Sequence, residues 1–279
     1  MTEENLYDAY VDLNTQLGLD YSKDKSTFKV YAPGLKSLAL RIFKSATDVV
    51  GKTYAMDKVP SGIFSISLDG DHDGSFYSYI VDSSIEVSDP YSIASMINSK
   101  KSAIVDLNAT NPKGFLDHKK PPTKAGEAII YELHIKDFSF NENSGVKNRG
   151  KFLGLGEEGT SFKGEKTALD HLVDLGISHV HLMPVYDFLT VDEDSDSFYK
   201  DDNYNWGYDP IHYFVPEGSY ATEPAQPKNR ITELKTMIMA LHKKGIKVVL
   251  DVVYNHTYRS KDSNFNILAD KYYYRQYKN

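Results

Sequence analysis

Short runs of alternating apolar and polar residues occupy roughly the first 110 positions of the chain. The clearest runs are 27–31, 38–43, 62–68 and 76–81. Turn-forming residues separate them, as at Pro33-Gly34 and in the segment 69–74. Even spacing of short strands with Gly, Pro and Asp between them is typical of a β-sandwich. No helical period occurs in this part, so we expect an immunoglobulin-like β-sandwich.

The pattern changes at about residue 127. Three apolar runs, 128–133, 180–183 and 246–250, alternate with two helical patterns that end at Gly176 and Gly245. Glycine is the usual residue just past the end of a helix. Strand, helix, strand, helix, strand predicts parallel βαβ units whose strands are buried on both faces. The helical patterns consist of Leu169, Leu172, Val173 and Leu175, then Ile231, Leu234, Ile238 and Leu241.

The change from an alternating pattern to a strand-helix pattern predicts two domains. We expect a β-sandwich over 1–112, a proline-containing linker over 113–126, and a parallel α/β domain over 127–279.

Composition narrows the partners. The 279-residue chain has a net charge of −7, no cysteine and no basic stripe, so we expect neither nucleic acid nor an anionic membrane as a partner. It lacks an apolar run of about 18 residues, the length of a membrane span. The first residues are acidic and polar, unlike a secretory signal, so we expect a cytoplasmic protein.

Candidate chemistry lies where the predicted parallel strands end, because function gathers at that edge of α/β sheets. Glu132, His134 and Asp137 follow the first strand, and a loop of more than 40 residues follows the second. The third strand leads into the segment 251–257, with Asp251, Asn255 and His256. From the residues alone, both groups could form a sugar site or a structural hydrogen-bond network. Zinc-protease, serine-hydrolase and phosphate-loop motifs are absent.

The acidic segment 192–196 resembles a calcium loop only superficially. It lacks the glycine and the closing glutamate of an EF-hand. We therefore expect a solvated loop, no metal site and no cofactor; calcium has no support in the sequence.

Three segments carry a resemblance to a known family. The segment 251–256 resembles the first conserved region of the α-amylase superfamily, glycoside hydrolase family 13. The segment 204–210, Tyr-Asn-Trp-Gly-Tyr-Asp-Pro, is similar to the more specific signature of type I pullulanases, and 131–139 resembles their first barrel strand. The first half of the chain resembles carbohydrate-binding module family 48, through 28–33 and 89–91.

The resemblance implies a fold and a reaction. The fold is a β-sandwich followed by the first three βα units of a truncated (β/α)8 TIM barrel. The reaction is retaining hydrolysis of α-1,6-glucosidic branches in pullulan, amylopectin or glycogen. Tyr208 would stack on the glucose at the cleavage site and His256 would bond one of its hydroxyls. Asp251 and Asn255 would orient that corner, with Asp209 contributing from the loop, while Trp206 would shape the loop.

The same resemblance implies what this chain lacks. A retaining glycosidase needs two carboxyl groups about 5 Å apart, and the family takes them from later strands, so we expect both beyond Asn279. The chain alone would then be inactive, a pullulanase fragment with an uncovered strand at 248–250. Because its first half has no tryptophan, we expect that module to support the other domain, with at most weak glucan binding through tyrosines. The alternatives are an isoamylase-like or branching enzyme, or a non-catalytic glucan-binding or regulatory protein.

Overall fold

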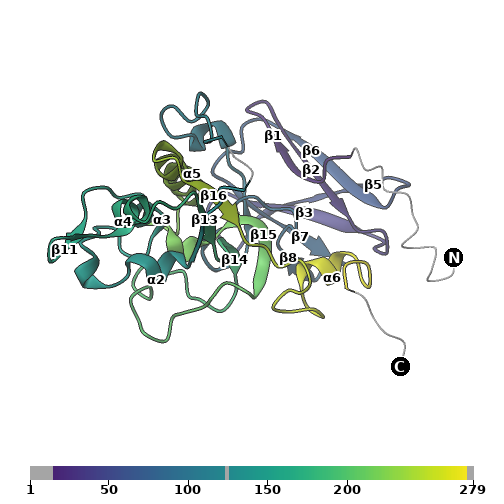
Figure 1. Cartoon of the computed structure of the whole chain (residues 1–279). Helices are drawn as coiled ribbons and strands as arrows, with labels where there is room; N and C mark the ends of the chain where they lie inside the picture. Colours follow the sequence, from purple (N-terminus) through teal and green to yellow (C-terminus); the bar gives the residue numbers. More distant parts are fainter. Residues whose placement is uncertain (1–14, 123–125, 275–279) are drawn as a thin grey trace. The chain divides into compact units, whose positions relative to one another are not determined.

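The computed structural model describes residues 15–122 and 126–274 (Figure 1). The chain folds into two compact units. Among the described residues, the first comprises 15–106, 211–215 and 255–274, and the second comprises 107–122, 126–210 and 216–254. The second unit thus includes 113–122, part of the segment 113–126 for which the sequence predicts a linker. The domain bounds 1–112 and 127–279 stay a prediction.

Two antiparallel sheets form the first unit. One has the strand order β1-β2-β6-β5, and the other has the order β4-β3-β7-β8, with β9 also paired to β7. The strands are β1 (Gly18–Tyr21), β2 (Lys25–Tyr31), β3 (Leu38–Phe43), β4 (Lys52–Ala55), β5 (Asp57–Lys58), β6 (Ile63–Asp69), β7 (Phe76–Val81), β8 (Ile85–Val87) and β9 (Ser102–Ala103). The four strands predicted from the sequence are β2, β3, β6 and β7, which confirms that prediction.

One apolar core serves both of these sheets. Phe28 and Val30 of β2 and Leu40 of β3 are fully buried, and they belong to the same core cluster as Phe64 and Tyr79. Their neighbours along each strand point the other way, as the period of two requires. Other regular elements in this unit are the 3-10 helix η1 (Ile97–Ser99) and α6 (Asn264–Leu268), with most of β15 (Pro210–Pro216).

A three-stranded parallel sheet organises the second unit, with the order β10-β13-β16. Its strands are β10 (Ile130–Leu133), β13 (His179–Leu182) and β16 (Lys247–Leu250). This unit also contains η2 (Leu107–Thr110), α2 (Ile135–Ser139), η3 (Glu142–Ser144), α3 (Phe152–Leu155), β11 (Ser161–Phe162), β12 (Glu165–Lys166), α4 (Ala168–Asp174), β14 (Tyr186–Phe188), η4 (Gly218–Tyr220) and α5 (Pro227–Lys243). The predicted order of strands and helices is confirmed.

The predicted burial on both faces is wrong for the two outer strands, whereas the exposure of Val249 and Leu250 agrees with the uncovered strand expected at 248–250. Ile130 of β10 is 59% exposed, and Leu250 of β16 is 47% exposed. Each of these strands pairs with β13 on one side only. In α4, Leu169 and Leu172 are buried, whereas Val173 and Leu175, the residue just after the helix, are exposed. None of the helices in the described part of the chain is both long and apolar enough to span a membrane.

Candidate functional site

The three parallel strands end at the same edge of their sheet. Leu133 of β10 pairs with Leu182 of β13, which pairs with Leu250 of β16. The residue after the third strand, Asp251, continues the ladder, because its N–H donates to the Leu182 carbonyl at 3.1 Å. The loops that follow the strands therefore start next to one another, as the sequence predicts for this unit.

Tyr208 and Asp251 meet at this edge. The Tyr208 hydroxyl donates to Oδ2 of Asp251 at 2.9 Å, although the two residues are 43 positions apart. Partial burial, and then the carboxylate of Asp251, raises the pKa of Tyr208 to about 12. The hydroxyl therefore stays protonated at neutral pH and acts as the donor. The structure brings together two of the five residues predicted to bind sugar.

The loop around Tyr208 depends on a glycine. Gly207 has φ +91°, a conformation that glycine adopts without steric cost. A Cβ at this position would lie 2.8 Å from Cβ of Pro184 and 3.0 Å from its carbonyl oxygen. The Gly207 N–H donates to Oδ1 of Asn205 at 2.6 Å, which closes the turn just before Tyr208.

Asp209 serves the same loop. Its Oδ2 accepts a hydrogen bond from the Thr190 hydroxyl at 2.7 Å, and its carbonyl accepts from the Leu189 N–H at 3.2 Å. Burial raises the pKa of this carboxyl group above its usual range. These bonds tie the two arms of the loop together, a role that the sequence did not predict for Asp209.

His134 and Asp137 hold the signature loop from the end of the first strand. Nε2 of His134 lies 2.9 Å from the Asn205 carbonyl and 2.8 Å from the Tyr220 hydroxyl. The Tyr204 hydroxyl donates to Asp137 at 2.6 Å. Burial lowers the pKa of His134, which favours a neutral ring that donates from Nε2. Of the two interpretations left open by the sequence, these contacts match the structural network.

Asn255 and His256, the other two residues predicted to bind sugar, belong to the first unit. Both are exposed. Nδ2 of Asn255 lies 2.9 Å from Nδ1 of His256, and the His256 carbonyl accepts from the Tyr213 hydroxyl at 2.9 Å. Trp206, in the signature loop of the second unit, is 62% exposed.

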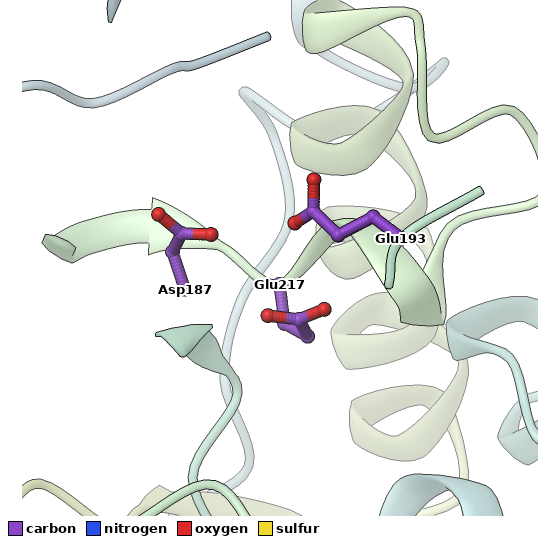
Figure 2. A group of neighbouring side chains, drawn as sticks. All are labelled: Asp187, Glu193 and Glu217. Atoms are coloured by element: carbon purple, nitrogen blue, oxygen red, sulfur yellow. The ribbon is translucent and has the colours of Figure 1, made fainter. Parts of the chain in front are cut away.

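A buried group of carboxylates lies near the base of the long loop, and the sequence did not reveal it. Asp187, Glu193 and Glu217 are at most 2% exposed, and one oxygen from each lies within 4.8 Å of the others (Figure 2). Carboxylate oxygens are the ligands of hard cations such as Ca²⁺. This is the only such group found among residues 15–122 and 126–274.

Arg230 of α5 supplies a positive charge to this group. Its guanidinium donates to both carboxylate oxygens of Glu193, at 2.9 and 2.8 Å, and is itself fully buried. The prediction of a solvated acidic loop is thus wrong at Glu193, while Asp194 and Asp196 are exposed. Glu193 is buried because a rigid bidentate partner, 37 residues away, compensates for its loss of water.

Glu217 caps backbone donors within the same group. Its two oxygens accept from the N–H groups of Phe188, at 3.2 Å, and Ser219, at 2.8 Å. Burial, and then the charges of Glu193 and Asp187, raises the pKa of Glu217 well above its usual range. Gly218 permits the close packing, because a Cβ there would lie 2.4 Å from Cζ of Arg230.

Comparison with known proteins connects this arrangement to one family. The family profile "Alpha amylase, catalytic domain" matches residues 133–277. A pullulanase of Bacillus subtilis is 38% identical over 267 residues, covering 93% of this chain and 36% of that one. Isoamylase 3 of Oryza sativa subsp. japonica is 34% identical over 166 residues, covering 57% of this chain and 20% of that one.

A solved structure gives the same relationship in three dimensions. The pullulanase from Paenibacillus barengoltzii, in complex with maltohexaose and alpha-cyclodextrin, matches with a TM-score of 0.92 and 38% identity. The match covers 97% of this chain and 43% of that chain. The present chain therefore spans between 36% and 43% of the length of these two pullulanases.

Proposed function

Because this chain belongs to the alpha-amylase family, we propose that it is part of a pullulanase-type hydrolase that cleaves α-1,6-glucosidic branches in α-glucans. One observation carries the proposal: Tyr208, in the signature loop, is held by Asp251 at the carboxyl edge of three parallel strands. A tyrosine fixed in this way offers a flat apolar surface with a polar edge, which suits a sugar ring.

The finer fold assignment belongs to this proposal. The two antiparallel sheets that share one core would form an immunoglobulin-like β-sandwich of the carbohydrate-binding module type. The sheet β10-β13-β16, with α4 and α5 between its strands, would be the first three βα units of a (β/α)8 barrel. The absence of a cofactor requirement stays a prediction.

Substrate binding is assigned to one wall of the sugar pocket. We assign Tyr208 to stacking and Asp251 to holding it, with Asp209 as a further contributor from the loop. The sugar-binding roles expected for Asn255 and His256 stay predictions. The nucleophile and the general acid are assigned, by resemblance, to strands that follow the three seen here. On this assignment the 279-residue chain binds a short α-glucan without cleaving it.

A binding titration tests the proposal. Maltotriose is titrated into the chain and its binding is followed by calorimetry or NMR. It is the ligand in a solved structure of a mutant pullulanase from Paenibacillus barengoltzii. We expect saturable binding that Tyr208→Ala weakens about tenfold, equivalent to about 1.4 kcal/mol of lost packing between the ring and the sugar. Tyr199→Ala is the matched control, since Tyr199 is 50% exposed and packs on Phe140 in another part of the loop.

Two results would contradict the proposal. One is equal affinity for the chain and its Tyr208→Ala variant, which would place the sugar elsewhere. The other is release of reducing ends from pullulan by the pure chain, which would show that the residues for cleavage are already present.

A further inference from the structure

His181 lies between two carboxylates on the parallel sheet. It is the third residue of β13, and its pairing partners are Glu132 of β10 and Val249 of β16. Its Nδ1 lies 3.5 Å from Oε2 of Glu132, and its Nε2 lies 3.9 Å from Oδ2 of Asp251. The side chain of His181 is 30% exposed, so water reaches the imidazole ring only in part.

The row ends at the tyrosine assigned to stacking. Oδ2 of Asp251, which faces His181, is also the atom that accepts the Tyr208 hydroxyl at 2.9 Å. Glu132, His181, Asp251 and Tyr208 thus form one line across the strand ends of the second unit. Rotation of the Asp251 carboxylate would change both contacts at once.

A histidine can contact two carboxylates at once, because its ring carries two nitrogen atoms. A neutral ring donates one hydrogen bond and an imidazolium donates two, one toward each carboxylate. The distances of 3.5 and 3.9 Å are longer than hydrogen bonds, so they are close polar contacts between the ring nitrogens and the carboxylate oxygens. Polar contacts in ligand-free sites are often long and shorten when the substrate binds.

We propose that His181 is a positioning residue: held by Glu132, it orients the Asp251 carboxylate, which in turn fixes Tyr208 for packing on a glucose ring. The proposal rests on the function proposed above. His181 itself touches no sugar in this scheme and acts through Asp251. Neither the strand pattern nor the family motifs had marked it, because it sits within an apolar run.

A spectroscopic experiment on the free chain tests the positioning step without any sugar. The chain is labelled with ¹³C in its tyrosine rings, and the Tyr208 resonances are assigned with Tyr208→Phe. We expect His181→Gln to move the Tyr208 resonances beyond their line width, and Glu132→Gln to move them in the same direction by less. His179→Gln is the matched control, because His179 lies on the same face of β13, two residues earlier.

Glu132→Gln keeps the test possible if His181→Gln does not fold. The Glu132 side chain is 61% exposed, so its replacement leaves the packed core intact even where His181→Gln does not fold. Unmoved Tyr208 resonances in a folded His181→Gln or Glu132→Gln chain would overturn the proposal. Equal shifts in His179→Gln would also overturn it, by showing a general response of the strand.

A maltotriose titration of the same variants separates this proposal from the proposed function. We expect His181→Gln to weaken binding about fivefold to tenfold, the effect of one lost polar contact, and His179→Gln to leave it unchanged. If the Tyr208 resonances move but no variant or parent chain binds maltotriose, the positioning row stands and the proposed function fails. If the parent chain binds and His181→Gln binds equally well, the function stands and the role of His181 fails.

Discussion

Two groups of carboxylates lie in the second unit, and water reaches them very differently. Asp187, Glu193 and Glu217 are buried around the guanidinium of Arg230. Glu132 and Asp251 flank His181 at the strand ends, with side chains that are 61% and 26% exposed. Each group combines acidic oxygens with one basic side chain, so composition alone does not distinguish them.

Burial decides what each group does. In the interior, a charge that loses its partner keeps its full desolvation cost, so the buried group holds the long loop in one conformation. At the strand ends, solvent screens the contacts between His181 and the two carboxylates, so each contact contributes little to stability. The role proposed for this group is therefore to orient Tyr208, and not to stabilise the fold.

The largest test of this difference is Arg230→Met. The substitution keeps much of the volume of the side chain but leaves Glu193 buried without its bidentate partner. We expect the free energy of unfolding to fall by about 3–5 kcal/mol, measured by urea denaturation. Lys166→Met breaks the exposed Lys166–Asp174 pair, whose Nζ–Oδ1 distance is also 2.8 Å, and should change little. Equal losses in the two variants would show that burial does not separate these ion pairs.

Gly207→Ala tests the loop that carries Tyr208 to the strand ends. The new Cβ would be 2.8 Å from Cβ of Pro184, in addition to the strain at φ +91°. Gly159→Ala is the control, because Gly159 has φ +76° and no atom within 4 Å of the new Cβ. We expect Gly207→Ala to cost about 1–3 kcal/mol more than the control and to shift the Tyr208 resonances. A loss no larger than in Gly159→Ala would mean that Pro184 yields to the added methyl group.

The pH dependence of the free energy of unfolding tests whether buried Glu217 holds a proton in the folded chain. The pKa of Glu217 is raised from its ordinary value of 4.5 in the folded chain, so the folded chain keeps a proton that the unfolded chain releases. The contribution of that proton to the free energy of unfolding is complete below pH 4.5. It is lost as the pH rises through the raised pKa.

Glu217→Gln removes this dependence. Its free energy of unfolding, relative to the parent chain, should rise with pH above 4.5, by at most about 1.4 kcal/mol per pH unit. Urea denaturation from about pH 4 to about pH 8 measures it. A difference that stays constant over this range would show that Glu217 has the same pKa in both states.

Local pattern was sufficient for much of the architecture. Alternation identified β2, β3, β6 and β7, because a half-buried strand places every second side chain in the core. Glycines that begin a left-handed turn identified the ends of α4 and α5, and both Gly176 and Gly245 have positive φ. The motif at 204–210 identified the loop that holds Tyr208 by its resemblance to the family signature, and the Gly207 N–H closes one turn of that loop locally on Asn205.

The chain alone thus determined the succession of strands and helices, the helix ends and the position of the signature loop, since those depend on neighbours a few residues away. Tertiary structure decided which charges are buried and which meet solvent. Glu193 looks like part of an acidic loop until Arg230, 37 residues later, is placed against it. His181 looks like an interruption in an apolar strand until Glu132 and Asp251 flank it. The physical reason is that the environment of a charge depends on the groups within a few ångströms of it, and here folding brings those groups from distant parts of the chain.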